Sequence, residues 1–204
     1  MANVCFILGL CSSILSLACI IVALASSQWL RIRSPDFMDD VGLMRHCDAD
    51  SSYCGEMEHL NALVDGHFAA WFRSIQAMYL LHCLGMLVST VVYILYAIRF
   101  LETKGSFRVL TLFNFVSLAA GIYSVAMFGM NHRSYFGIAD SSVTEDMAIL
   151  GYGFNIAITG CCLAFLTMLF SAMEASRAVD LLQNMQNRFT VWTTPYTLFV
   201  DQEA

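Results

Sequence analysis

Two cysteines, Cys47 and Cys54, are separated by six residues in the acidic, polar stretch VGLMRHCDADSSYCGE of this 204-residue chain. Cysteines at this spacing support two chemistries. They can form a disulfide that closes a short hairpin, or their thiolates can bind zinc together with His46 and His59. The ligand spacing fits no compact zinc finger. The choice therefore depends on the compartment that this stretch faces.

Other side chains that could do chemistry are few. Long apolar runs contain His82, Asn114 and Asn155 as their main polar features, and we expect His82 to be hydrogen-bonded to a neighbour. The runs contain no paired carboxylates, no His-x-x-x-His pattern and no Ser/His/Asp set. An intramembrane protease or a proton-coupled carrier would need such groups. We therefore expect no enzyme, no cofactor and no metal site.

The composition indicates a membrane protein. Hydrophobic residues make up 58% of the chain and charged residues 13%, whereas about a quarter of the residues in soluble domains are charged. The formal net charge is −6. Since nothing suggests a basic surface, we expect no nucleic-acid partner.

Four runs lack Asp, Glu, Lys and Arg and are long enough to cross a bilayer: 1–30, 74–98, 109–132 and 147–173. Backbone groups in lipid must be paired internally, so the runs predict α-helices. We expect an all-α membrane protein, a left-handed bundle with transmembrane helices at about 5–28, 75–98, 109–130 and 147–173. Ala23-Leu24-Ala25 resembles a signal-peptidase site, but MANV lacks Lys and Arg, so we interpret the first run as a helix.

The short link RFLETKGSFR sets the orientation, because Arg99, Lys104 and Arg108 outnumber Glu102. Positive links favour the cytoplasmic side. Both termini are then cytoplasmic, and the loops 29–73 and 131–146 face outward from a plasma membrane. The cysteine pair would lie in an oxidising compartment, which favours the disulfide, worth about 2–3 kcal/mol for so short a loop.

The first outer loop predicts a small extracellular antiparallel sheet. QWLRIRS alternates apolar and charged residues as a strand does, VGLMRHC is read as the next strand, and the disulfide would join it to SYCGEME. Trp29 and Trp71 flank this loop, and we expect both rings at the membrane interface. The loop has eight acids against four bases. That surplus indicates either a solvated surface or a field that attracts cations or a basic partner.

These residues together resemble the claudin superfamily of four-helix membrane proteins, which includes the peripheral myelin and epithelial membrane proteins, the lens fibre membrane protein and the γ subunits of calcium channels. The matching residues are Trp29, Gly42-Leu43-Met44, Cys47 and Cys54, followed by Arg73 in AAWFRSIQAMYLL. AAGIYSVAMFG and YGFNIAITG are similar to later parts of the family. The resemblance covers about 5–175. Met44 replaces the signature Trp, which suggests a diverged member.

The resemblance implies a claudin-like membrane domain at 1–175, and 176–204 would be a cytoplasmic tail. AMEASRAVDLLQNMQNRF is expected to extend the fourth helix beyond the membrane. Tyr196-Thr197-Leu198-Phe199 matches a Tyr-x-x-apolar endocytic signal, and the alternative is an aromatic segment resting on headgroups or on a partner. Cys5, near the cytoplasmic end of the first helix, is a candidate for palmitoylation, and the alternative is apolar packing.

Two functions follow as expectations. The first is cell–cell contact or junction organisation, in which the outer sheet meets a second copy in cis or in trans. The second outer loop would then supply apolar trans contacts through Tyr135, Phe136 and Ile138. The alternative is an auxiliary subunit, as the γ-subunit resemblance implies, which packs sideways against a pore-forming channel or receptor subunit and modulates its gating or trafficking.

Overall fold

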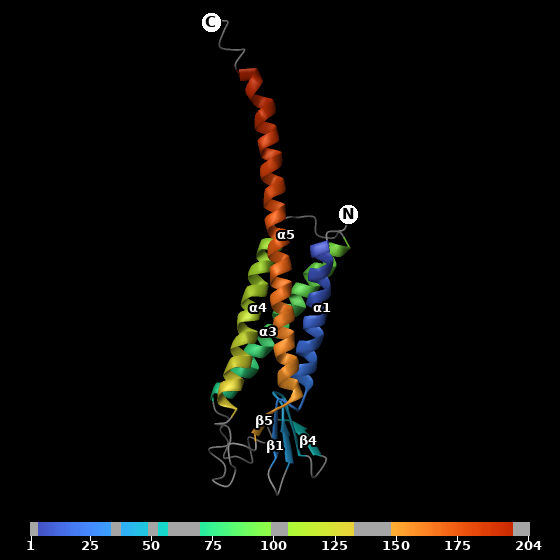
Figure 1. Ribbon diagram of the computed structural model, residues 1–204, viewed down its shortest axis with the longest axis vertical. Helices are drawn as coiled ribbons and strands as arrows, with labels where there is room; N and C mark the ends of the chain where they lie inside the picture. Colours follow the sequence, from blue (N-terminus) through green and yellow to red (C-terminus); the bar gives the residue numbers. More distant parts are fainter. Residues whose placement is uncertain are drawn as a thin grey trace.

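The computed structural model describes residues 4–33, 38–48, 53–56, 70–98, 106–132 and 148–197. Most of these residues are helical, and the remainder includes a small sheet (Figure 1). The helices are α1 (Val4–Ala25), α3 (Ala70–Ala97), α4 (Ser106–Asn131) and α5 (Tyr152–Thr197). The strands are β1 (Leu30–Arg33), β2 (Met38–Val41), β3 (Arg45–Asp48), β4 (Tyr53–Glu56) and β5 (Ala148–Leu150).

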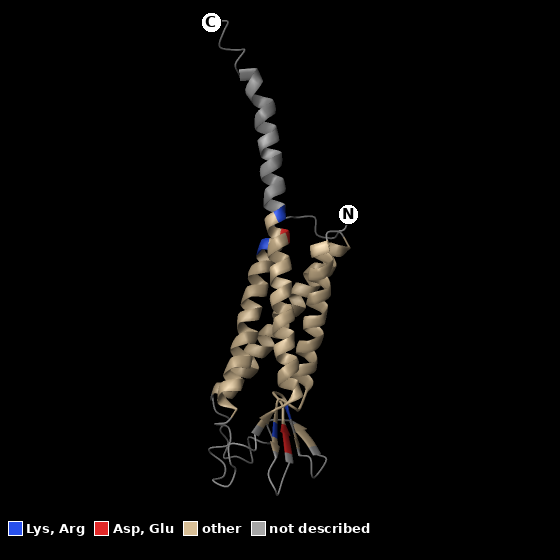
Figure 2. Ribbon diagram, in the orientation of Figure 1, with Lys and Arg blue, Asp and Glu red and all other residues tan. Residues whose placement is uncertain are grey.

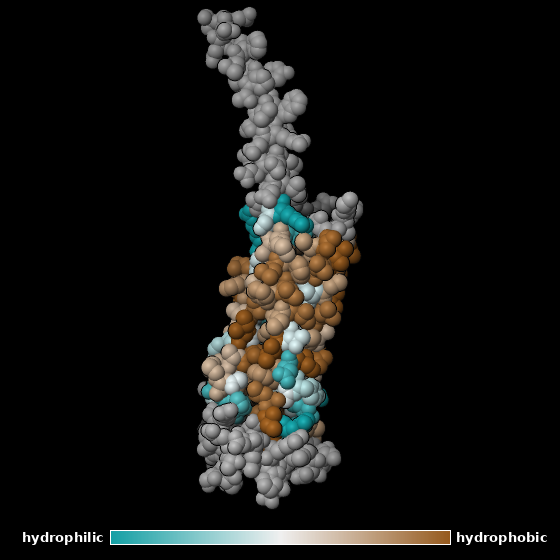
Figure 3. Space-filling model, viewed as in Figure 1, coloured by the Kyte–Doolittle hydropathy of each residue, from teal (hydrophilic) through white to brown (hydrophobic). Residues whose placement is uncertain are grey.

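Four helices contain segments that are long and apolar enough to cross a membrane: Val4–Ala25, Trp71–Ala97, Phe107–Asn131 and Tyr152–Arg177. Their outer surfaces carry large apolar side chains, which form a broad band over the bundle (Figure 3). Charged residues gather at the two ends of the bundle (Figure 2). The prediction of four helices suited to a multi-pass membrane protein is confirmed.

The helices form a ring of neighbours. α1 packs against α5 and α3, and α4 packs against α3 and α5. The sheet lies at one end of the bundle, whereas α1 begins and α5 ends on the opposite side (Figure 1). The strands, which carry the Arg31–Asp40 ion pair, therefore form a lobe beyond one end of the bundle.

The small antiparallel sheet has five strands in the order β4-β3-β2-β1-β5. The first four strands come from the segment between α1 and α3, and β5 comes from the segment just before α5. β5 pairs with β1, with Leu150 opposite Leu30. A sheet in this region confirms the coarse prediction, and β5 ties the second connecting segment to the first.

Three of the boundaries that differ from the predictions lie next to the sheet or within it. The stretch predicted as a single strand, VGLMRHC, is broken at Gly42, where the chain turns between β2 and β3. The fourth helix starts at Tyr152, not near 147, because residues 148–150 add to the sheet. α1 ends at Ala25, and not near 28. Ser26 Oγ accepts a hydrogen bond from the backbone N–H of Gln28 and supports the turn into β1.

α5 has 46 residues, which corresponds to about 69 Å at 1.5 Å per residue. It extends past the ends of the other helices (Figure 1). The predicted extension of the fourth helix beyond the membrane-spanning segment is therefore present. It crosses the expected domain boundary at 175 without a break in the helix.

Trp29 is not an interfacial residue, and that prediction is wrong. Its side chain is 0% exposed, and its ring makes edge contacts with Tyr79, Phe128 and Phe154 from three different helices. The indole Nε1 donates to the Ala23 carbonyl at 2.6 Å. The ring can be buried because the polar N–H finds a partner at the end of α1.

Candidate interaction surface

The disulfide joins β3 and β4, the two strands at one edge of the sheet. Cys47 in β3 and Cys54 in β4 are direct cross-strand partners, with Cα atoms 4.1 Å apart and the sulfurs bonded. Because both sulfurs are used in this bond, the disulfide replaces the zinc alternative. His59 lies outside the described residues. Within the described chain, no three His, Cys, Asp or Glu side chains are grouped so as to hold a metal ion.

One face of the sheet points away from the bundle. The cross-strand register places five residues in a row on this face: Ile149, Arg31, Asp40, Cys47 and Cys54. We call this set the outer row. Ile149 at one end is 53% exposed, and Cys54 at the other end is also exposed. The row thus offers an aliphatic side chain, an ion pair and a disulfide on adjacent strands.

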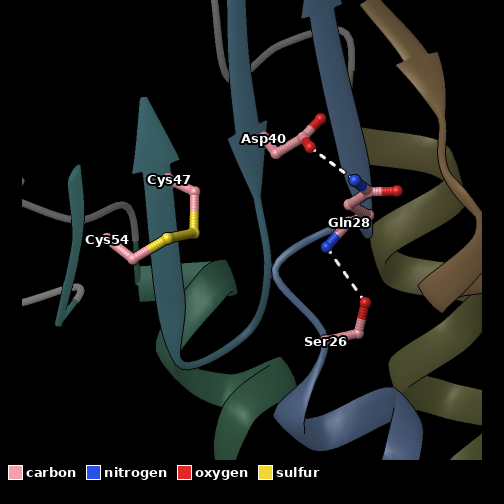
Figure 4. The surroundings of a disulfide bond; sticks show 5 residues. All are labelled: Ser26, Gln28, Asp40, Cys47 and Cys54. Carbon is pink, nitrogen blue, oxygen red and sulfur yellow. Dashed lines mark hydrogen bonds between the residues drawn. A yellow bond between two sulfur atoms is a disulfide. The ribbon is translucent and has the colours of Figure 1, made fainter. Parts of the chain in front are cut away.

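The centre of the outer row is held by polar contacts. Arg31 Nε donates to Asp40 Oδ1 at 3.0 Å, and the side-chain Nε2 of Gln28 donates to Asp40 Oδ2 at 2.6 Å (Figure 4). Both carboxylate oxygens of Asp40 are therefore engaged. This fixes the orientation of the Arg31 guanidinium, although a partly exposed pair of this kind adds little to stability.

The opposite face of the sheet is buried. Leu30, Ile32 and Val41 are at most 2% exposed and belong to the same apolar cluster as the helix residues below them. The alternation along β1, with Leu30 and Ile32 inside and Arg31 outside, is the period-2 pattern of a half-buried strand. The sheet is consequently packed on the bundle by one face, and its other face carries Arg31 and Asp40.

The turn between β2 and β3 fastens the sheet to the helices. Leu43 is fully buried, and Gln76 of α3 donates to its carbonyl at 2.6 Å. A Cβ on Gly42 would overlap the Ser26 carbonyl oxygen and lie 2.8 Å from Ser27 Cα. Only glycine permits this approach of two backbone segments.

The remaining residues of the family signature divide between this turn and α3. Met44 is partly buried and packs against the central apolar cluster. It therefore helps to hold the turn against the helices. Arg73 is exposed in the first turn of α3. The structure brings Trp29, Leu43 and Met44 into one core and leaves Arg73 outside it.

Inside the bundle, His82 is fully buried and bonded to its neighbours. Its Nδ1 lies 3.0 Å from Ser117 Oγ on α4, and its Nε2 lies 3.9 Å from Cys161 Sγ on α5. The expectation of a hydrogen-bonded histidine is confirmed. The contacts join three helices, which is the use that polar side chains commonly have in membrane bundles.

Sequence reasoning missed the hydroxyl contacts that join α1 to its neighbours. Ser13 pairs with Thr90 at 2.6 Å and Ser12 with Thr167 at 2.9 Å. Ser16 Oγ donates to the Gly160 carbonyl. The signal was available, because hydroxyl residues recur on one face of the first apolar run.

Sequence reasoning also missed a polar group at the end of the bundle opposite the sheet. Ser171 of α5 accepts hydrogen bonds from Thr111 and from Asn114 of α4. One turn later, Glu174 is 9% exposed and accepts from Arg177 at 3.3 Å. The fourth apolar run was taken to end at Met173, so this buried carboxylate escaped notice. Asn155, by contrast, is exposed near the other end of α5.

Several predicted contact residues fall outside the described structure. Tyr135, Phe136, Ile138 and Phe199 lie outside the described residues, and of Tyr196 only the helical backbone is described. Cys5 is partly exposed in the first turn of α1, at the bundle end opposite the sheet. Its acylation stays a prediction.

Neither protein-family models nor curated proteins give a match to this chain. The claudin-superfamily resemblance rests on the residues quoted above and stays a prediction.

Proposed function

We propose that this chain is a non-enzymatic, claudin-like protein of the plasma membrane that acts in cell–cell contact or junction organisation. In this proposal the bundle is left-handed, both termini are cytoplasmic and the sheet is extracellular. The observation that carries the proposal is the outer row. It is the polar face of a small sheet whose other face is packed on the bundle and whose edge strand is held by a disulfide.

The chemistry of the outer row suits recognition of a protein surface. Interfaces combine apolar contact with oriented polar groups, and Ile149 lies opposite Arg31, which is paired with Asp40. A face that is already fixed loses little conformational entropy on binding. The partner in this proposal is a second copy of the chain, in cis or from the opposing cell.

Cell aggregation tests this proposal. Suspension cells that express the protein should aggregate, and Ile149→Thr should abolish the effect, because threonine keeps the β-branched shape but loses aliphatic contact. Ile158→Thr is the matched control, since Ile158 is exposed on the bundle surface of α5. Changing Tyr135 and Phe136 to Ser tests the second outer loop in the same assay.

Surface amounts of all variants are measured in parallel by flow cytometry. If cells with the unaltered protein stay dispersed, or if Ile149→Thr and Ile158→Thr behave alike, the contact proposal fails.

A second candidate is an auxiliary subunit of a channel or receptor. The length of α5 favours it, because the helix extends about 30 Å beyond the segment that spans the membrane at 1.5 Å per residue. Such a subunit would change a conductance on co-expression in isolated cells, with no cell contact required. A conductance change in single cells that express a non-aggregating protein would select this candidate over the first.

A further inference from the structure

Among the described residues, four buried side-chain atoms have no hydrogen-bond partner: Tyr79 OH, Ser89 Oγ, Tyr93 OH and Asn114 Oδ1. All four residues are 0% exposed. A buried polar group without a partner has given up its hydrogen bonds to water and gained none in the protein, so such groups are rare in native proteins. The places where they gather therefore point to something that satisfies them.

Three of the four atoms belong to one level of the bundle. A Cβ on Gly85 of α3 would lie 2.6 Å from Ser117 Oγ of α4, which aligns these two positions. α3 runs away from the sheet and α4 runs back toward it (Figure 1). One turn further along α3 and one turn earlier in α4 therefore bring Ser89 and Asn114 to the same level. Tyr93 is one turn beyond Ser89 on the same face, and side chains on a helix lean back toward its start.

The Tyr93 hydroxyl lies between α1 and α5. A Cβ on Gly9 of α1 would lie 2.7 Å from Tyr93 OH, so the lack of a side chain at residue 9 makes room for the hydroxyl. The hydroxyl is also close enough to Ser171 and Glu174 of α5 to interact with both, but by distance and angle it makes no hydrogen bond. The bundle thus accommodates a polar group that a phenylalanine ring at this position would lack.

Ser89 differs from nearby hydroxyl residues of α3 and α4. Thr90 donates to the Met86 carbonyl, and Thr111 donates to the Phe107 carbonyl. Bonding of this kind to the carbonyl four residues earlier is the usual solution for a hydroxyl inside a helix. Ser89 does not use it, so its hydroxyl is available to a molecule in the interior of the bundle.

The three atoms define the chemistry of that molecule. The hydroxyls of Ser89 and Tyr93 can donate, whereas Asn114 Oδ1 can only accept. The other end of the same amide already donates to Ser171. A molecule that satisfies all three must accept and donate at once. Water does both, and a buried water typically makes about three hydrogen bonds.

A cation fits this place less well. Glu174 is the acid that interacts with Tyr93, and its carboxylate is paired with Arg177 at 3.3 Å. The two charges cancel. The pair therefore offers no net charge to offset the cost of moving a cation from water into an apolar bundle. A neutral molecule is favoured.

We propose that Ser89, Tyr93 and Asn114 bind one water molecule between α3 and α4 in the interior of the bundle. The water accepts from the two hydroxyls and donates to Asn114 Oδ1. It links the two helices about one turn beyond the direct contact of His82 with Ser117. The inference goes beyond cell contact and does not depend on it.

The direction of a stability change tests the site. If the hydroxyls are unpaired, Tyr93→Phe and Ser89→Ala remove a desolvation penalty, and the melting temperature in detergent stays the same or rises. With a bound water, each substitution should lower it by about 2–4 °C, as loss of one hydrogen bond does in a chain of this size. Tyr79→Phe is the control and should cause no such fall, because Tyr79 OH is equally buried and unpartnered but packs beside Trp29.

A double variant shows whether the two hydroxyls bind the same molecule. Ser89→Ala combined with Tyr93→Phe should lower the melting temperature by less than the sum of the single shifts, because partners of one molecule are coupled. Ser89→Ala combined with Tyr79→Phe should give the sum. Additive shifts for the first pair overturn the proposal, as do single variants that are as stable as the unaltered protein.

X-ray radiolysis of the full chain in nanodiscs detects a bound water more directly. Hydroxyl radicals that form from the water modify the side chains beside it, and mass spectrometry of peptides locates the modification. We expect hydroxylation at Tyr93 and none at Tyr79. No modification at Tyr93, or equal modification of the two tyrosines, contradicts the site.

Exchange of the salt separates water from a cation. The melting temperature of the unaltered protein is measured in sodium chloride and in choline chloride at the same ionic strength. Equal values are expected for a water site. A fall in choline chloride that is missing in Tyr93→Phe would assign the three atoms to a sodium ion and overturn the proposal.

Discussion

At Gly42 the turn between β2 and β3 lies close against the backbone that links α1 to β1. Its N–H donates to the Arg45 carbonyl at 2.8 Å, and a Cβ would lie against the backbone of Ser26 and Ser27. Neither neighbour is a flexible side chain that could move aside. Both the conformation of the turn and the packing of the sheet therefore require that residue 42 has no Cβ.

Gly42→Ala should lower the free energy of unfolding by at least about 2 kcal/mol, because overpacking against backbone is poorly relieved. Gly129→Ala is the control, since its Cβ would meet Phe154 at 3.4 Å, an ordinary contact. Thermal unfolding of the two purified variants in detergent measures the difference. Equal melting temperatures would show that the turn tolerates a methyl group and that the close approach is unimportant.

For single residues, the sequence indicated which ones have a structural role more reliably than it indicated where their side chains lie. Cys47 and Cys54 were paired correctly, because two cysteines in one polar segment leave few alternatives. Trp29 was placed at the interface, but its ring lies in the core, since only tertiary contacts reveal that three aromatic residues from other helices surround it.

Among the elements, the hairpin of β3 and β4 depends most on a covalent bond. β4 is an edge strand of only four residues, and short edge strands gain little from pairing alone. Replacing Cys47 and Cys54 together by Ser should cost about 2–3 kcal/mol and retain the protein inside the cell.

The fraction of protein at the cell surface measures this effect, with Cys11→Ser as the control, because Cys11 is a free, exposed cysteine on α1. Normal surface delivery of the double variant would refute the structural role of the disulfide.

The helices could be predicted from the sequence because an uninterrupted apolar run of this length can pair all its backbone groups in lipid only as an α-helix. β5 could not, because its three residues become a strand only through pairing with β1, and the apolar run before α5 reads equally well as helix. The outer row was also hidden, since its members come from five separate strands.

For the whole molecule, the bundle and the sheet differ in where they place their polar groups. The bundle uses its polar side chains internally, as the contacts of His82 and Ser171 show, and presents an apolar surface outward (Figure 3). The sheet carries its charged pair, Arg31 and Asp40, on the face that points away from the bundle.

The proposed function requires that the sheet faces the outside of the cell. Intact cells are treated with a membrane-impermeant reductant and then with an impermeant maleimide, and labelled cysteines are assigned by mass spectrometry of peptides. We expect Cys47 and Cys54 to be labelled on intact cells only after reduction, while the six cysteines of the helices stay unlabelled. Labelling of Cys47 and Cys54 only after permeabilisation would place the sheet inside the cell and contradict the proposed function.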